Sequence, residues 1–315
     1  MWKNASLSLS IVAIVALIIS INTTNQRLLK LEGNRSSGEI DLSASDFENI
    51  SSIPGPVVSF ELPNKITFAG DSVPLKIQDV KERLDKELHI NTYLHGSTIF
   101  LMKRANRWLP QIDSILKKEG IPEDFKYLPL IESALLNDVS PKDAVGFWQI
   151  LKSAGKENGL EITNEVDERY DPLKATEAAC NYLRTSYRKF GNWTLVAASY
   201  NRGMAGTQRA MNSQKVSNYY DLYLNDETAR YVFRILAIKE IINNPKKYGF
   251  NVKPEYLYEQ EKLRYVEVTE TIPNLIAFSL QQGINYKLLK RYNPWLREER
   301  LTVRKGKSYK IAIPV

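Results

Sequence analysis

The chain has 315 residues, a formal net charge of +7, 43% hydrophobic residues and 25% charged residues. This length allows about two domains with extensions, and this composition excludes a chain that is disordered throughout. The basic residues form no long run and match no nucleic-acid-binding motif, so we expect no nucleic-acid partner. A modest positive charge suits an anionic polymer such as cell wall, a membrane surface or an ordinary soluble domain equally well.

The N-terminal segment is apolar. Residues 4–26 carry no charge, and residues 7–21 are almost entirely apolar. This run is longer than the apolar core of a typical signal peptide and shorter than a typical membrane-spanning helix. No small-x-small cleavage site and no lipid-accepting cysteine follow it. We therefore predict that residues 1–25 are an uncleaved signal anchor that binds the membrane, with a cleaved signal peptide as the alternative.

Residues 26–74 are rich in Ser, Asn, Gly and Pro and are predicted to be a linker with short strand-forming pieces. Apolar residues then recur at helical spacing and predict helices over 76–88 and 98–118, the second ending at Gly120. Further helices are expected over 172–189, 193–200 and 226–243. No alternating segment interrupts this part of the chain, so residues 75–250 are predicted to form an all-α domain.

The third helix has clear signals at both ends. Asp171 followed by Pro172 is a capping side chain with proline at the first helical position, and Gly191 lies where the helix would stop. Beyond residue 250 the pattern changes. Residues 264–269 and 308–313 alternate as strands do, and two short helical segments at 272–281 and 286–292 lie between them. Residues 251–315 are therefore predicted to form a small βααβ module.

The cysteine and histidine content limits the possible chemistry. Cys180 is the only cysteine, so no intrachain disulfide can form. It lies among apolar residues at helical spacing, as a small buried hydrophobe would. The two histidines, His89 and His95, both precede the region richest in motifs. We expect no metal site and no cofactor.

The most informative stretch is residues 122–150, which contains Glu132. Leu128, Leu130 and Ile131 would surround its carboxyl group with hydrocarbon, which raises the pKa and suits a proton donor. If the helix begins at Pro129, its N-terminal dipole would favour the anion instead, and the sequence leaves this balance open. A lone Glu on a helix is most often a solvated surface charge.

Four motifs occur in order: E-S at Glu132, S-P-K-D-A-V-G-F-W-Q over 140–149, A-S-Y-N-R-G over 198–203 and E-T-A-R-Y-V over 227–232. Together they resemble the lytic murein transglycosylase family with the lysozyme-like fold, closest to its membrane-bound type D enzymes. The resemblance covers about residues 90–250. It implies an overall fold class that is mainly α, with a lysozyme-like catalytic domain.

The C-terminal part resembles a LysM glycan-binding module, through Leu289, Asn293-Pro294 and Ile313-Pro314. Thr269-Glu270-Thr271 stands where such modules usually have Gly-Asp-Thr, which puts sugar binding in question. The alternative is a small structural cap on the catalytic domain.

Glycosidases generally use two carboxyl groups, and Asp138, Asp143, Asp167 and Asp171 have no context that distinguishes one of them as the second. The resemblance implies that Glu132 acts alone. It would protonate the oxygen between N-acetylmuramic acid (MurNAc) and N-acetylglucosamine (GlcNAc), and then accept the proton of the C6 hydroxyl as a 1,6-anhydro ring closes. No water is consumed, so no carboxylate is needed to position water.

The resemblance also assigns substrate binding to residues around Glu132. Each has a plainer alternative: a local backbone bond for the serine, core packing for the aromatic residues and a helix-ending turn for the asparagine. Two positions depart from the family pattern, Asp143 where glycine is common and Ser199 where alanine is usual. The predicted substrate-binding residues are Ser133, Gly146, Phe147, Trp148, Gln149, Tyr200, Asn201 and Tyr231.

These observations predict a lytic transglycosylase of the cell envelope. It would be anchored in the membrane and would act on peptidoglycan glycan strands outside the cytoplasmic membrane. A hydrolase of the goose-type lysozyme class and a non-catalytic cell-wall-binding protein are the alternatives.

Overall fold

The computed structural model describes residues 58–315. The predicted signal anchor at residues 1–25 and the predicted linker as far as residue 57 lie outside the described residues. Among residues 58–315, no helix is both long and apolar enough to cross a membrane.

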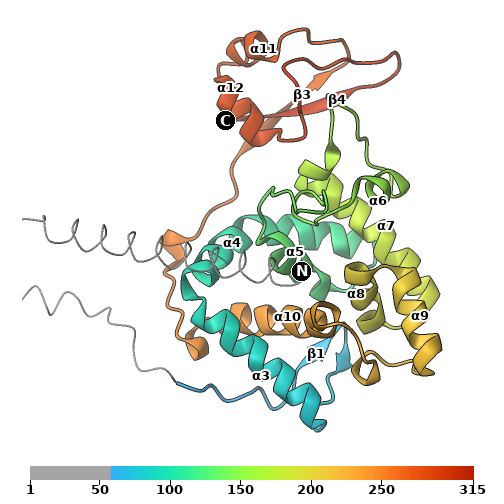
Figure 1. Ribbon diagram of the computed structural model, residues 1–315. Helices are drawn as coiled ribbons and strands as arrows, with labels where there is room; N and C mark the ends of the chain where they lie inside the picture. The colour runs from blue at the N-terminus through green and yellow to red at the C-terminus, as the bar shows by residue number, and fades with distance from the viewer. Residues whose placement is uncertain (1–57) are drawn as a thin grey trace, which may run out of the picture. The chain divides into compact units, whose positions relative to one another are not determined.

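The chain from residue 78 to residue 243 is built from helices joined by loops, as Figure 1 shows. The all-α prediction for this part of the chain is confirmed. Its α-helices are α3 (Gln78–Tyr93), α4 (His95–Lys118), α5 (Leu128–Ser133), α6 (Lys152–Glu157), α7 (Pro172–Phe190), α8 (Trp193–Arg202), α9 (Met204–Gln214) and α10 (Asp226–Asn243).

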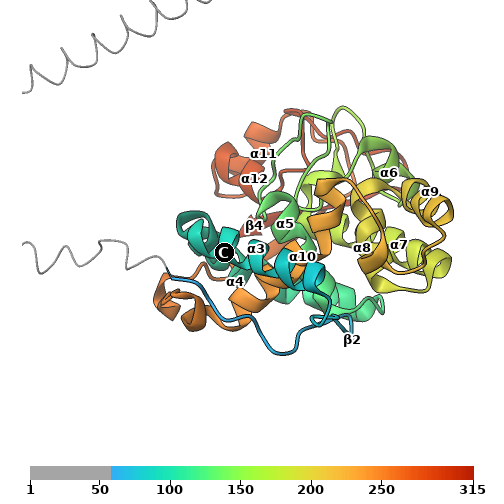
Figure 2. The same cartoon turned by 60° about the horizontal axis from the view of Figure 1, so that its bottom comes forward.

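Helix α10 is central to the packing. It contacts α3, α5 and α8, and Figures 1 and 2 show α3 and α5 beside it from two directions. Ile235, Leu236 and Ala237 have no exposed surface. Burying such apolar surface is the main favourable term in folding. The position of α10, and of the side chains that it carries, is therefore fixed by its packing in the domain core.

The predicted ends of α7 agree with the structure, whereas the helix predicted over 76–88 continues to Tyr93. The Asp171 carboxylate accepts hydrogen bonds from the backbone N–H groups of Leu173 and Lys174 at 2.9 and 3.1 Å, and α7 ends at Gly191, whose φ is +62°. Helix α9 was not predicted. Its buried residues are Gly206, Thr207 and Ala210, so it has no stripe of large apolar side chains to reveal it.

Residues 59–74 pack on the helical core. A short hairpin pairs β1 (Thr67–Phe68) with β2 (Asp71–Ser72), and Phe68 is fully buried, with its ring 5.4 Å from that of Phe125. The Ala69 N–H donates to Asp124 Oδ2 at 2.7 Å, and Lys239 Nζ donates to the Thr67 carbonyl at 2.9 Å. The described part of the predicted linker is therefore ordered against the domain.

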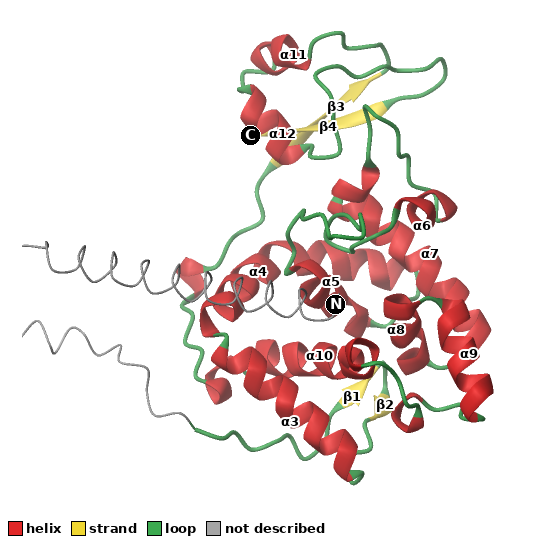
Figure 3. Cartoon of the chain, viewed as in Figure 1, coloured by secondary structure: helices red, strands yellow, loops and turns green. Residues whose placement is uncertain are grey.

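The C-terminal module follows the predicted order. Strand β3 (Leu263–Val268) pairs antiparallel with β4 (Tyr309–Pro314), and α11 (Leu275–Gln281) and α12 (Tyr286–Tyr292) lie between them in sequence (Figure 3). The side chain of Asn293 is buried and exchanges two 2.7 Å hydrogen bonds with the backbone of Ala312. The Asn293-Pro294 element thus ties the end of α12 to β4.

Candidate active site

Helix α5 carries Glu132 at its C-terminal end. Pro122 precedes a 3₁₀ turn (Glu123–Tyr127), and Pro129 is in the first turn of α5, where proline is tolerated. The helix ends at Ser133, because Ala134 adopts a left-handed conformation with φ +52°. Glu132 is the fifth residue of this six-residue helix, so it does not lie at the N-terminal end, where the helix dipole favours an anion.

Glu132 is half-buried, on the same short helix as the core residues Leu128 and Leu130. Burial raises its pKa, and this effect exceeds the opposing effects of the hydrogen bond from Tyr231 and the positive charge of Arg234. The negative charge of Glu227 raises the pKa further. A carboxyl group with a raised pKa keeps its proton at a higher pH, as a general acid requires.

Tyr231 and two arginines hold the catalytic end of α5. The Tyr231 hydroxyl, on the buried side of α10, donates to Glu132 Oε1. Arg234, one turn further along α10, donates to the Ile131 carbonyl at 2.5 Å, and Arg104 Nε donates to the Ala134 carbonyl at 2.6 Å. Cations at the carbonyl end of a helix satisfy groups that have no partner within it.

The loop over residues 143–150 lies next to Glu132. Ser133 Oγ donates to the Phe147 carbonyl at 2.9 Å and lies 3.3 Å from the Pro129 carbonyl. Gly146 has φ +79°, and a Cβ atom there would lie 2.1 Å from the carbonyl oxygen of Arg169. Only glycine fits this conformation and this close contact.

The two aromatic residues of this loop point into the core. Phe147 and Trp148 are 4% and 0% exposed, so both rings are packed in the core, which was the alternative to substrate binding for these two residues. The Trp148 indole N–H donates to Thr176 Oγ1 at 2.8 Å. The next residue, Gln149, is half-buried with φ +49°, and its Nε2 donates to the carbonyls of Asp138 at 3.0 Å and Gly146 at 2.9 Å.

The tyrosine and asparagine near the end of α8 complete the cluster. The Tyr200 hydroxyl donates to the Trp148 carbonyl at 2.7 Å. Burial, and then the negative charge of Glu132, raise the pKa of Tyr200, which therefore remains a donor. Asn201 Nδ2 donates to Glu227 Oε1 at 3.0 Å, and Asn201 Oδ1 accepts a 2.6 Å bond from the Thr228 hydroxyl.

These bonds join the four sequence motifs in a closed ring. The first motif binds the second through Ser133 and Phe147, and the second binds the third through Trp148 and Tyr200. The third binds the fourth through Asn201 and Glu227, and the bond from Tyr231 to Glu132 joins the fourth to the first. Segments as far apart as residues 132 and 231 therefore form one site.

The residues that sequence reasoning missed are the charged neighbours. Arg104, Glu227 and Arg234 act on Glu132 or its helix, and none was predicted. Glu227 belongs to the fourth motif, which was used only for Tyr231, so a signal for it was present. Of the aspartates considered as a second carboxyl group, Asp167 pairs with Arg169 and Asp171 caps α7.

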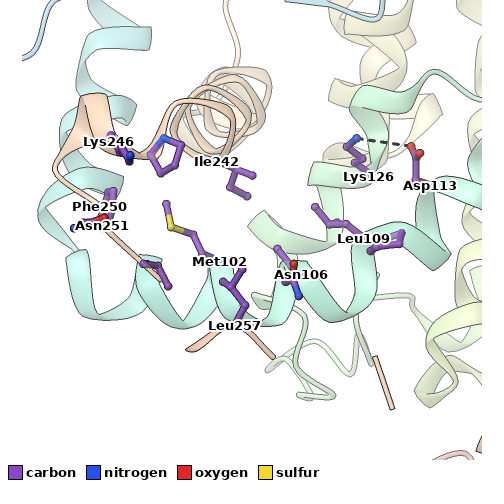
Figure 4. Close-up of a pocket in the computed structure, with 14 residues that line it drawn as sticks. Met102, Asn106, Leu109, Asp113, Lys126, Ile242, Lys246, Phe250, Asn251 and Leu257 are labelled. Carbon is purple, nitrogen blue, oxygen red and sulfur yellow. Dashed lines mark ion pairs between the residues drawn. The ribbon is translucent and has the colours of Figure 1, made fainter. Parts of the chain in front are cut away.

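A pocket of about 460 Å³ lies elsewhere, between α4, the end of α10 and residues 250–257 (Figure 4). Its walls include Met102, Leu109 and Ile242, and none of the predicted site residues lines it. Within residues 58–315, no group of three or more His, Cys, Asp or Glu residues is placed to hold a metal ion.

Comparison with known proteins agrees with this arrangement. Residues 111–222 match the family model of the transglycosylase SLT domain, and residues 264–315 match that of the soluble lytic transglycosylase C-terminal LysM-like domain. Residues 111–222 thus belong to the SLT transglycosylase domain family and residues 264–315 to the LysM-like domain family.

Two curated relatives of this chain are the proteins named membrane-bound lytic murein transglycosylase D of two strains of Escherichia coli. Each is 31% identical to it over 235 residues, which cover 72% of this chain and 50% of the relative. The chain thus spans about half the length of the curated relatives it matches. Among solved structures, an inactive mutant of the lytic transglycosylase Slt from Pseudomonas aeruginosa is similar, with 18% identity and a TM-score of 0.35 over 49% of this chain and 26% of that one.

Proposed function

We propose that the protein is a peptidoglycan lytic transglycosylase that cleaves the β-1,4 bond between MurNAc and GlcNAc and leaves 1,6-anhydro-MurNAc ends. The observation that carries this proposal is Glu132: a half-buried carboxyl group with a raised pKa, bonded to the Tyr231 hydroxyl and enclosed by the motif ring. The names of the curated relatives, which are lytic murein transglycosylases, support the same substrate class.

In the first step, Glu132 gives its proton to the glycosidic oxygen, and the bond between that oxygen and C1 of MurNAc breaks. The N-acetyl oxygen of the substrate stabilises the positive centre at C1. In the second step, the Glu132 carboxylate accepts the proton of the C6 hydroxyl while the C6 oxygen bonds to C1. The hydrogen bond from Tyr231 stabilises the carboxylate between the two steps.

The predicted substrate-binding residues take two roles in this proposal. Ser133, Gln149, Tyr200 and Asn201 are half-buried polar residues of the ring and are proposed to contact the sugars or to orient Glu132. Gly146, Phe147 and Trp148 are buried, and we propose that they hold the loop in place from within.

We further propose that the protein works in the cell envelope, tethered to the membrane through residues 1–25, with its catalytic domain outside the cytoplasmic membrane. The support is the apolar run at residues 7–21 and the name of the Escherichia coli relatives, which are membrane-bound. Peptidoglycan lies on that side of the membrane, so the proposed substrate requires this topology.

The test is product analysis. Purified peptidoglycan sacculi are digested with the parent chain, with Glu132→Gln and with Glu123→Gln, the same change at an exposed carboxylate nine positions earlier. Mass spectrometry is expected to show anhydro-ended muropeptides from the parent and from Glu123→Gln. Glu132→Gln is expected to be slower by at least about 100-fold, the usual contribution of a general acid.

Two other results would contradict the proposal. Reducing ends would identify a hydrolase, and Glu227 would then be the candidate second carboxylate because its charge already acts on Glu132. Binding of sacculi with no product released would identify a non-catalytic wall-binding protein.

A further inference from the structure

The loop between α6 and α7 inserts into the C-terminal module, and Figure 3 shows it reaching the module's strands. Val166, at its tip, is 2% exposed and belongs to the hydrophobic core that the module builds around Leu275 and Leu289. The Asp167 N–H donates to the Trp295 carbonyl at 2.9 Å, and the Arg297 N–H donates to the Glu165 carbonyl at 2.8 Å. The Val166 side chain, the ring of Tyr170 packed against the same core and two backbone hydrogen bonds thus fix the loop in the module.

Charged groups surround this insertion. Glu165 pairs with Arg300 at 2.7 Å and accepts a 2.7 Å bond from the Thr302 N–H. Glu161, at the base of the loop, pairs with Lys307 at 2.5 Å and accepts from the Tyr309 hydroxyl at 3.1 Å. Such partly exposed pairs each contribute little, so Val166 and the backbone bonds are the main attachment.

The other end of the loop holds the active-site segment. Arg169 is 7% exposed, and its guanidinium group binds both carboxylate oxygens of Asp167, at 3.0 and 2.7 Å. The same group donates to the carbonyls of Asp143 at 3.0 Å and Ile150 at 3.2 Å, which are the two ends of the 143–150 loop. The Arg169 carbonyl is the atom against which Gly146 is packed.

A buried, bidentate arginine with no freedom to move transmits displacement, because breaking any of its bonds leaves a charge or a carbonyl unsatisfied in the interior. Asp167 is shared between the two contacts: its backbone N–H binds the module, and its side chain binds Arg169. The 143–150 loop in turn accepts the bond from Ser133, the neighbour of Glu132.

We propose that the docked C-terminal module positions the active-site loop through Val166, Asp167 and Arg169, so that docking of the module is a requirement for full catalytic rate. Arg169 is then a positioning residue for the Glu132 site. This inference rests on the proposed function and adds a role for the module that does not depend on glycan binding.

The experiment releases the module without removing it. Val166→Asp places a charge in the module core and opposes docking, and Ile276→Asp places the same charge at a module position that is 38% exposed. Both are compared with the parent on a soluble tetrasaccharide of alternating GlcNAc and MurNAc, whose cleavage needs no glycan binding by the module. The chains carry 5-fluorotryptophan, and the resonances of Trp148 and Trp295 are assigned by Trp→Phe replacement.

Val166→Asp is expected to shift the Trp295 and Trp148 resonances together and to lower kcat by about tenfold or more, as a small displacement of positioning groups does, with KM changed much less. Ile276→Asp is expected to leave kcat and the Trp148 resonance as in the parent. Arg169→Lys, which keeps the charge and loses the fork of hydrogen bonds, is expected to lower kcat without moving Trp295.

A Trp295 shift in Val166→Asp with an unchanged Trp148 resonance and unchanged kcat would overturn the proposal. If Val166→Asp does not fold, the milder Val166→Ala removes apolar contact from the module core without adding a charge, and it must move kcat and Trp148 in the same directions. If the parent chain does not cleave the tetrasaccharide, the proposed function is contradicted instead. The Trp148 resonance in Val166→Asp would still show whether release of the module changes the 143–150 loop.

Discussion

The Tyr231 hydroxyl donates a hydrogen bond to Oε1 of Glu132, 99 residues earlier in the chain. This bond opposes the effect of burial on the carboxyl group, because it stabilises the charged form. The pKa of Glu132 is therefore set by competing influences, and mutation of Tyr231 removes one of them.

Removing the donor should shift the pH dependence of activity. In Tyr231→Phe the lowering effect of this hydrogen bond is lost while burial remains, so the pKa of Glu132 rises further and the alkaline limb of the pH–rate profile moves to higher pH. The maximal rate should fall by about 10- to 100-fold, the effect of losing a hydrogen bond to a charged group. Tyr127→Phe, which removes a hydroxyl bonded to Asn243, is the control and should leave the profile in place. An unmoved alkaline limb in Tyr231→Phe would contradict the assignment.

Glu132 should also limit stability. Its folded pKa lies above that of the unfolded chain, so the native state binds more protons, and the free energy of unfolding decreases as the pH rises through the interval between the two values. Glu132→Gln does not titrate. It should match the parent more closely at pH 4 and be the more stable protein at pH 8. Thermal unfolding at both pH values measures this, and a Gln variant with no relative gain at pH 8 would refute it.

Gly146 should tolerate no side chain. Gly146→Ala must adopt φ +79° and place its Cβ atom against the Arg169 carbonyl, whereas Gly249→Ala has the same φ and nothing within 4 Å. The control should cost about 1 kcal/mol from backbone strain alone, and Gly146→Ala should cost about 2–4 kcal/mol because backbone must move. Urea unfolding compares them, and equal costs would show that the close contact is unimportant.

Cys180 should be inert in the folded protein. It has no exposed surface, and burial raises the pKa of its thiol to about 12. The thiolate is the reactive form, so labelling by iodoacetamide at pH 8 should proceed only as fast as the domain opens. A rate that rises with urea in parallel with unfolding is the expected result, and rapid labelling of the native protein would contradict it.

Sequence patterns predicted the helices that carry strong local signals. The proline, capping and glycine positions around α5 and α7 fix those elements because they act within a few residues. Helix α9 escaped prediction because its buried face consists of small residues. The βααβ order of the module was predicted because its two strands alternate and its helices are short and separate.

The site was predicted in part. The motifs identified Glu132 and its ring of neighbours, and the structure brings these residues together. The arginines at the end of α5 and the paired Asp167 and Arg169 could not be found this way. These arginines bind backbone carbonyls, which every residue has, so the sequence does not show which carbonyl a given arginine will bind. The same limit applies to Phe147 and Trp148, whose order in the motif does not reveal which way their rings point.

The packing of Phe68 on Phe125 has a practical consequence for anyone preparing this enzyme. A version trimmed to start at residue 75 would leave Phe125 uncovered and would remove the backbone amide that Asp124 binds. Because Asp124 also pairs with Lys239 of α10 at 2.7 Å, the damage would extend to the helix that supports Tyr231. Trimming should therefore stop before residue 59, and a protease that cuts between residues 59 and 74 is expected to destabilise the helical domain rather than release it intact.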